Sequence, residues 1–346
     1  MLAVGLLIVL VAMAMTWVYQ NCRPPPPKTC GSPGGPPITA PRIKLRDGRH
    51  LAYKEHGVPA KVAKYKIIFV HGLSACRYGP VILKSLPQEL IEELGLYILS
   101  FDKPGYGESD PHPTQTLKSL ALDIEELADH LKLGSKFYVI GYSIGSHLVW
   151  GCLKYIPHRI AGATLLAPII NYWWQGLPPN LSKEAYYKQL LQDQWTNRVV
   201  HYIPWLTYWW NTQKWFPALS AVPGNLDIFS RNDLEIMSKK VIGPQIYKAH
   251  LTQQGEFESL HRTMLVGFGN WEFSPIDLEN PFPNNEGSVH LWQGDEDKLV
   301  DVNLQRFIAK KLPWIQYHEL SGAGHFFPYA VGMSKVIIDT LLFGEK

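Results

Sequence analysis

The sequence predicts an α/β fold with a mostly parallel central sheet flanked by helices. Short apolar segments recur along the chain at residues 66–70, 96–101, 136–141, 161–166, 288–293 and 315–319. Helical stretches separate them, as is required where crossover helices join parallel strands. In one such stretch the apolar residues follow helical spacing: Leu117, Leu120, Ile124, Leu127 and Leu131. With 346 residues and 46% hydrophobic content, the chain can bury one full core and carry an insertion besides.

The N-terminal segment, residues 1–20, has the composition of a transmembrane anchor. It holds no charged side chain, and residues 2–15 are apolar or glycine throughout. At 1.5 Å per residue, a helix of about 19 residues spans close to 30 Å, the thickness of a bilayer's hydrocarbon core. Trp17 and Tyr19 stand where the aromatic residues of a membrane interface are expected.

A cleaved signal peptide is the alternative, because Ala12-Met13-Ala14 resembles a small-residue cleavage site. The absence of basic residues before the apolar run favours an anchor. Basic residues follow it instead: Arg23, Lys28, Arg42, Lys44 and Arg46. Because basic flanks tend to stay cytoplasmic, we expect a single-pass membrane protein whose globular part lies in the cytosol. The alternative places it in the lumen of the secretory pathway or outside the cell.

Residues 21–41 are a Pro- and Gly-rich linker, and residues 42–346 form the globular domain. The run from Pro24 to Pro41 has no means of packing a core. The domain begins with a predicted hairpin, in which residues 42–46 and 50–55 flank Asp47-Gly48.

Composition excludes several classes of protein and of site. A net charge of +3, with Lys and Arg spread along the chain, is too small to indicate a nucleic-acid partner. Glycine-rich phosphate loops and the paired Cys or His spacings of metal sites are absent, so no cofactor and no metal is implied. Cys76 and Cys152 are expected to be buried free thiols. Cys22 and Cys30 can pair only in an oxidising compartment.

The segment from Tyr138 to His147 predicts a nucleophilic serine. A β-branched run enters Gly141-Tyr142-Ser143-Ile144-Gly145, and a helical stretch leaves it. In such a nucleophile elbow the serine is held at the tip of a sharp turn with its hydroxyl exposed. Backbone passes so close to Gly141 and Gly145 that a Cβ at either position would clash.

A nucleophilic serine needs a base, and the base needs an acid that orients it. The segment 288–293 ends in an acidic turn that contains Asp297, and the segment 315–319 is followed by a small-residue turn and His325. Upstream, residues 67–70 run into His71-Gly72-Leu73, a glycine turn that can present a backbone N–H to a developing oxyanion.

These segments together resemble the α/β-hydrolases of the esterase and lipase-like type, over roughly residues 40–346. The order Ser, Asp, His is the family's chain order. The motifs that carry the resemblance are His71-Gly72, Phe101-Asp102-Lys103-Pro104-Gly105-Tyr106-Gly107-Glu108-Ser109, the elbow, Gly294-x-x-Asp297 and Gly322-x-Gly324-His325. The resemblance implies an α/β-hydrolase fold, a mostly parallel sheet with an inserted helical lid.

Carried over to these residues, the resemblance implies Ser143 as nucleophile, His325 as general base and Asp297 as the acid that orients it. It implies an oxyanion hole made by the N–H groups of Leu73 and Ile144. Structural roles fall to Gly141, Gly145, His71 and Gly72.

Other residues compete for these roles. His71 is the alternative base, although the family uses that position structurally. Asp295 and Asp301 are alternative acids, and the Gly-x-x-Asp spacing favours Asp297. Asp102 is expected to hydrogen-bond its own loop. The remaining histidines considered carry no partner signature: His147, His158, His201, His250 and His261.

The alternation of short apolar strands and helical stretches is interrupted between residues 171 and 280, where the family inserts its helical lid. Eight of the chain's twelve tryptophans fall here: Trp173, Trp174, Trp195, Trp205, Trp209, Trp210, Trp215 and Trp271. Such aromatics line an apolar acyl pocket or dip into a membrane interface, or else they pack the insertion onto the sheet. We expect at least some of them to face the substrate.

The sequence therefore predicts a membrane-anchored serine hydrolase of carboxylic esters with an apolar acyl group, lipid-derived acyl groups included. Its partners are a small-molecule ester and a membrane. A serine nucleophile argues against epoxide hydrolase and dehalogenase chemistry, which uses an aspartate in this superfamily. The alternatives are an acyltransferase and a hydrolase-fold receptor with little turnover.

Overall fold

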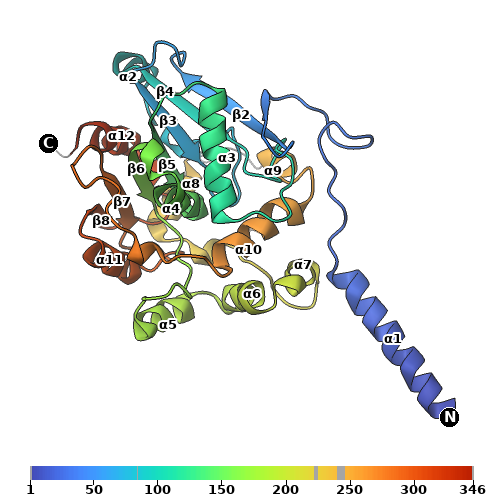
Figure 1. Ribbon diagram of the computed structural model, residues 1–346. Helices are drawn as coiled ribbons and strands as arrows, with labels where there is room; N and C mark the ends of the chain where they lie inside the picture. Colours follow the sequence, from blue (N-terminus) through green and yellow to red (C-terminus); the bar gives the residue numbers. More distant parts are fainter. Residues whose placement is uncertain (1, 84, 222–224, 240–245, 345–346) are drawn as a thin grey trace.

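The computed structural model describes residues 2–83, 85–221, 225–239 and 246–344 (Figure 1). Within them the chain forms an eight-stranded sheet of order β1-β2-β4-β3-β5-β6-β7-β8. The strands are β1 (Arg42–Lys44), β2 (His50–Gly57), β3 (Tyr65–Val70), β4 (Leu96–Phe101), β5 (Phe137–Tyr142), β6 (Ile160–Leu166), β7 (Val289–Gly294) and β8 (Ile315–Leu320). Strand β2 pairs antiparallel with β1 and β4, and every later pairing is parallel. The predicted fold class, its strands and its hairpin are confirmed.

Helices cover both faces of the sheet. One face packs against α3 (Leu117–His130), α4 (Ser146–Tyr155) and α11 (Val302–Lys311), and the other against α2 (Gln88–Leu94) and α12 (Met333–Phe343). Thr116 caps the start of α3 and forms a capping box with Ser119. Its predicted apolar stripe is buried from Leu117 to Leu127.

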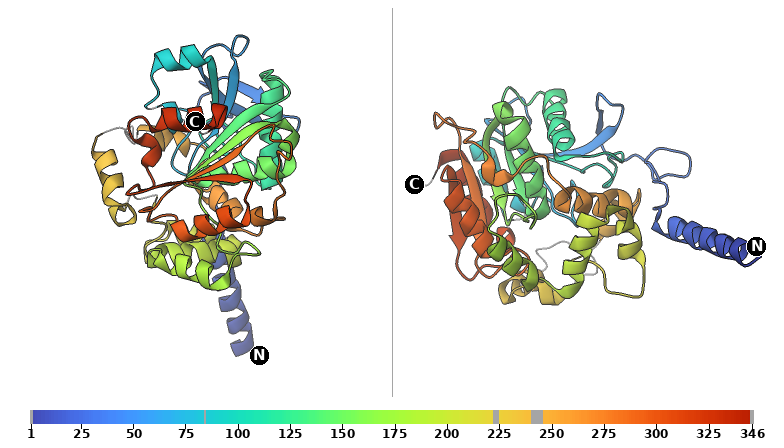
Figure 2. Two further views of the ribbon diagram at one scale, coloured as in Figure 1. Left: turned by 90° about the vertical axis from the view of Figure 1, so that its left-hand side faces the viewer. Right: turned by 60° about the horizontal axis from the view of Figure 1, so that its bottom comes forward.

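The segment between β6 and β7 lies at one end of the sheet (Figure 2). It contains α5 (Pro179–Lys188), α6 (Leu191–Tyr202), α7 (Thr207–Thr212), α8 (Arg231–Ser238), α9 (Ile246–Leu251) and α10 (Arg262–Phe268), the last preceded by a π-helical turn at Phe257–His261. We call residues 171–280 the insertion, of which 222–224 and 240–245 lie outside the described residues.

Helix α1 (Leu2–Cys22) projects from the molecule at the end where α7 lies (Figures 1 and 2). It is the one helix of the described chain long and apolar enough to cross a membrane, and its window Val4–Cys22 is unburied. The segment that follows is tied to the domain at two points. Cys30 N–H donates to Gln254 Oε1 at 3.1 Å, and Thr39 N–H donates to Glu108 Oε2 at 2.6 Å.

Candidate active site

The elbow joins β5 to α4 at Ser143. This serine has a φ of 55°, a conformation that few non-glycine residues adopt. A Cβ at position 141 would lie 2.6 Å from Val149 Cγ2, and one at 145 would lie 2.5 Å from Val70 O. Both positions therefore require glycine, because the strained turn brings neighbouring elements within contact distance.

The structure brings Ser143, His325 and Asp297 together. Ser143 Oγ lies 3.0 Å from His325 Nε2, and Asp297 Oδ2 lies 2.8 Å from His325 Nδ1. The three side chains come from the carboxyl ends of β5, β7 and β8, which meet at one edge of the parallel sheet. This is the geometry of a serine paired with a base that a carboxylate orients.

Further hydrogen bonds hold the Asp297 carboxylate in place. Its Oδ1 accepts from Leu299 N–H at 2.8 Å and Val300 N–H at 3.1 Å, and its Oδ2 accepts from Gln293 Nε2 at 3.0 Å. These donors hold the carboxylate in one orientation beside His325 Nδ1, so it fixes the imidazole tautomer.

The pKa of His325 lies above its ordinary value of 6.5. Burial of the ring on its own lowers this pKa. The charge and hydrogen bond of Asp297 outweigh burial, and the charge of Asp233 adds to them. The site therefore stabilises the imidazolium that forms when a base takes a proton from serine.

The two competing acids have other partners. Asp295 Oδ1 accepts from Gly322 N–H at 2.7 Å. Asp301 caps the start of α11 and pairs with Lys188 at 2.9 Å. Of the three candidates, Asp297 is the one in contact with the histidine.

His71 is held by backbone groups. Its Nδ1 bonds Gly72 O at 2.8 Å, and its Nε2 accepts from Lys103 N–H at 3.2 Å. Burial first, and then the Lys103 charge, hold the pKa of His71 well below 6.5. A neutral ring with both nitrogens engaged fits the structural role.

Asp102 does bond its own loop, accepting from Glu108 N–H at 3.1 Å. Its main partner was not predicted. The fully buried carboxylate forms an ion pair with the buried guanidinium of Arg77, which also contacts Glu108 at 2.7 Å. The sequence separates Arg77 and Asp102 by a strand and a helix, so no local motif links them.

Asp233, on α8 of the insertion, is a site residue that the sequence analysis missed. It is fully buried, and its carboxylate accepts from the backbone N–H groups of His325 at 3.0 Å and Phe326 at 2.6 Å. Any Cβ at position 324 would overlap this carboxylate, which explains Gly324. The signal in the sequence is Ser230-x-x-Asp233, a helix-capping pattern. This pattern does not indicate a contact with the loop that carries His325, which we call the histidine loop.

A cavity of about 430 Å³ contains Ser143 in its wall. The predicted oxyanion residues Leu73 and Ile144 line it as well. Its other apolar lining includes Ile169, Tyr172, Leu219, Ile228, Met264 and Phe268, and its polar lining includes Lys188, Gln189, Asp193 and Asn197.

The aromatic residues of the insertion that line this cavity are not the tryptophans. Tyr172 and Phe268 line the cavity, but no tryptophan of the described residues does. Trp174 and Trp271 pack against each other beside His147. Others, such as Trp205 and Trp215, lie on the outer surface. The spacing of aromatic residues on short helices does not reveal which face meets a cavity.

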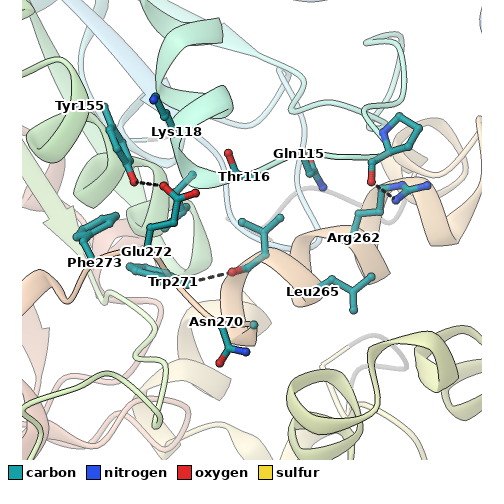
Figure 3. A pocket seen from close by; sticks show the side chains of 14 residues that line it. Gln115, Thr116, Lys118, Tyr155, Arg262, Leu265, Asn270, Trp271, Glu272 and Phe273 are labelled. Atoms are coloured by element: carbon teal, nitrogen blue, oxygen red, sulfur yellow. Dashed lines mark hydrogen bonds between the residues drawn. The ribbon is translucent and has the colours of Figure 1, made fainter.

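A smaller hollow of about 200 Å³ lies between the start of α3 and the end of α10 (Figure 3). Tyr155 donates to Glu272 at 3.0 Å at one side of it, and Arg262 donates to Pro113 O at 2.9 Å. No member of the Ser143 cluster lines this hollow. In the described part of the chain, no group of three or more His, Cys, Asp or Glu side chains is arranged to hold a metal ion.

Comparison with known proteins places this chain in a family. A family model described as alpha/beta hydrolase fold matches residues 65–329. No curated protein matches the chain.

Many solved structures share the fold. An esterase from Thermogutta terrifontis superposes with a TM-score of 0.57 at 17% identity, covering 88% of this chain and 96% of its own. An enol-lactonase from Burkholderia xenovorans LB400 gives 0.58 at 15%, covering 87% and 99%. Epoxide hydrolases from metagenomes of hot environments give 0.51 at 15%, covering 89% and 99%. At these identities the likeness shows the fold alone, and the fold hosts several reactions.

Proposed function

Because the chain belongs to the α/β-hydrolase family, we propose that it is a serine hydrolase that cleaves carboxylic esters with an apolar acyl group. The observation that carries the proposal is the continuous hydrogen-bonded series Ser143–His325–Asp297, which opens on the cavity of about 430 Å³.

In the proposed reaction, His325 Nε2 takes the proton of Ser143 Oγ as that oxygen attacks the ester carbonyl. The N–H groups of Leu73 and Ile144 bind the oxyanion, and Asp297 stabilises the imidazolium. The imidazolium then protonates the leaving alkoxide, which departs as an alcohol. Water, deprotonated by the same imidazole, releases the carboxylic acid and restores Ser143.

The nucleophile separates ester cleavage from epoxide opening. Attack of a carboxylate on an epoxide gives an ester that water can cleave, whereas attack of a serine alkoxide would leave a stable ether. Ser143 therefore favours esters, including cyclic ones, over epoxides.

The cavity wall supports an amphiphilic substrate. The apolar lining suits an acyl chain, and the polar side chains of α5 and α6, among them Gln189 and Asn197, suit a polar alcohol part. The proposal includes α1 as an uncleaved membrane anchor, with the globular domain on the cytosolic side.

The test uses the full chain, with a fluorophosphonate probe and chromogenic esters of graded acyl length. Wild type should be labelled and should turn over the esters. Ser143→Ala should lose labelling and at least about 10⁴-fold in kcat. The control Ser321→Ala, at an exposed serine near the histidine loop, should retain both. Labelling without turnover of any ester would instead indicate a receptor.

A further inference from the structure

The outer surface of the insertion carries large apolar side chains that the protein leaves exposed. Their exposed fractions run from 47% for Trp195 to 69% for Trp215. The set comprises Leu191, Trp195, Tyr202, Trp205, Trp215 and Phe216, and we call it the outer lid surface. Single exposed apolar residues are ordinary, but a group of this size on α6 and the segment that follows it to Phe216 marks an interaction surface. Trp210 links its members, since its ring stacks on Phe216 and lies 6.5 Å from that of Trp195.

Helix α6 separates this surface from the active-site cavity. Asp193 and Asn197, on its inner side, line the cavity. Leu191, Trp195 and Tyr202, on its outer side, recur at the spacing of one helical face. One helix therefore faces the substrate on one side and the unexplained apolar surface on the other.

Helix α1 lies beside this surface. Val11 and Val18 of α1 line one groove together with Trp205 and Phe257. At 1.5 Å per residue, Val18 and Val11 stand about 6 and 16 Å from Cys22 along the helix axis. Both lie inside the apolar window Val4–Cys22, so Trp205 stands beside the part of α1 that a bilayer would cover.

A second groove is lined by side chains of the kind that proteins place at the lipid headgroups. Trp17 and Arg23 of the N-terminal segment line it together with Trp209, Lys214 and Trp215. Tryptophan with Arg or Lys is the combination found where a protein crosses from hydrocarbon to lipid headgroups.

We propose that the outer lid surface rests in the same bilayer leaflet that α1 enters. The partner of this surface is a phospholipid bilayer rather than a protein, because Trp205 adjoins the apolar helix α1 and Trp215 lies among aromatic and basic side chains typical of a membrane interface. The inference rests on the span of α1 proposed above. It deepens that proposal: an ester dissolved in the bilayer meets the helix that lines the active-site cavity without first crossing water.

Lipid photolabelling of the full chain tests the contact directly. The protein is reconstituted into phosphatidylcholine vesicles that contain a diazirine-tailed phosphatidylcholine, irradiated and digested with trypsin. We expect lipid adducts on α1 and on peptide 199–214, which carries Tyr202 and Trp205. Peptide 119–132 is the control, because it carries the exposed, apolar Leu122 and comes from α3, which lies away from α1 (Figure 1). Adducts on α1 alone would overturn the inference, and adducts on neither would overturn the anchor with it.

A paired variant links the contact to substrate access. Trp205→Asp with Trp215→Asp should remove the adducts on peptide 199–214. It should slow turnover of a long-chain ester dissolved in the vesicles by about ten-fold or more, while leaving a water-soluble butyrate ester unchanged. Leu122→Asp should change neither. Equal turnover of the vesicle-borne ester by wild type and the double variant would contradict the access route. If no ester is cleaved at all, the proposed chemistry fails, while the photolabelling result stands on its own.

Discussion

At the scale of single residues, two neighbouring carboxylates provide a matched test of the catalytic acid. Asp297 contacts His325 Nδ1 at 2.8 Å, whereas Asp295 accepts the N–H of Gly322. Asp297→Asn should lower kcat for esters by roughly 10⁴-fold, because an amide no longer favours the required tautomer. Asp295→Asn should cost less than about ten-fold. If Asp295→Asn abolished turnover while Asp297→Asn retained it, the acid would be Asp295 rather than Asp297.

The raised pKa of His325 predicts the pH profile. Only the neutral imidazole can act as the base, so kcat/KM should be fully present above the pKa of His325 and should fall as the pH drops through it. The midpoint should lie above 6.5.

Asp233 should shift that midpoint. Its negative charge contributes to raising the pKa of His325, so Asp233→Asn should move the midpoint to lower pH and lower kcat several-fold. The control is Asp339→Asn, on α12, which should leave the profile unchanged. A lower kcat with an unmoved midpoint would mean that Asp233 acts on the fold of the loop alone.

That Ser143, Asp297 and His325 lie close together could be predicted, because each follows a strand in a short motif. It did not reveal Asp233, which lies 92 positions before His325 and whose local pattern matches an ordinary helix cap. The Arg77–Asp102 ion pair was missed for the same reason. Contacts made only by the folded chain leave no local signature.

At the scale of elements, the insertion should set the preference for acyl length. Each buried CH₂ contributes about 0.8 kcal/mol, so kcat/KM should rise up to about four-fold per added CH₂ until the cavity is filled. Leu219→Trp narrows the cavity and should move the optimum to shorter chains. The control is Leu122→Trp on α3, which should leave the optimum unchanged. A wild-type preference for acetate would contradict an apolar acyl substrate.

Glycosylation of the sequon Asn180-Leu181-Ser182 in α5 indicates on which side of the membrane the globular domain lies. Asn180 is exposed, so a lumenal domain would present an acceptor, whereas the proposed cytosolic domain should carry no glycan. The measurement is the mass of the protein from its native membrane before and after endoglycosidase. A mass shift that disappears in Asn180→Gln would contradict the proposed orientation.

Strand positions could be predicted because an apolar run between turn residues is a local signal. The roles of the tryptophans could not. Helical spacing separates a buried face from an exposed one, but the sequence of α6 does not say that its inner side lines a cavity and its outer side is left open.

At the scale of the whole molecule, the insertion stands between α1 and the sheet edge that carries Ser143. It supplies Asp233 to the histidine loop, α6 to the cavity wall and Trp205 to the groove beside α1. The segment after α1 was predicted to have no means of packing a core. It contacts Gln254 and Glu108, which lie far along the chain. No local sequence pattern indicates such contacts.

The proposed reaction passes through an acyl-enzyme on Ser143, which water then cleaves. The direct measurement is rapid acid quenching of the full chain during turnover of a chromogenic octanoate, followed by mass analysis of the tryptic peptides. An octanoyl adduct should occur on peptide 137–154, should form and decay at rates consistent with kcat, and should be absent from Ser143→Ala. Undiminished turnover by Ser143→Ala, or an adduct on another peptide, would contradict the claim.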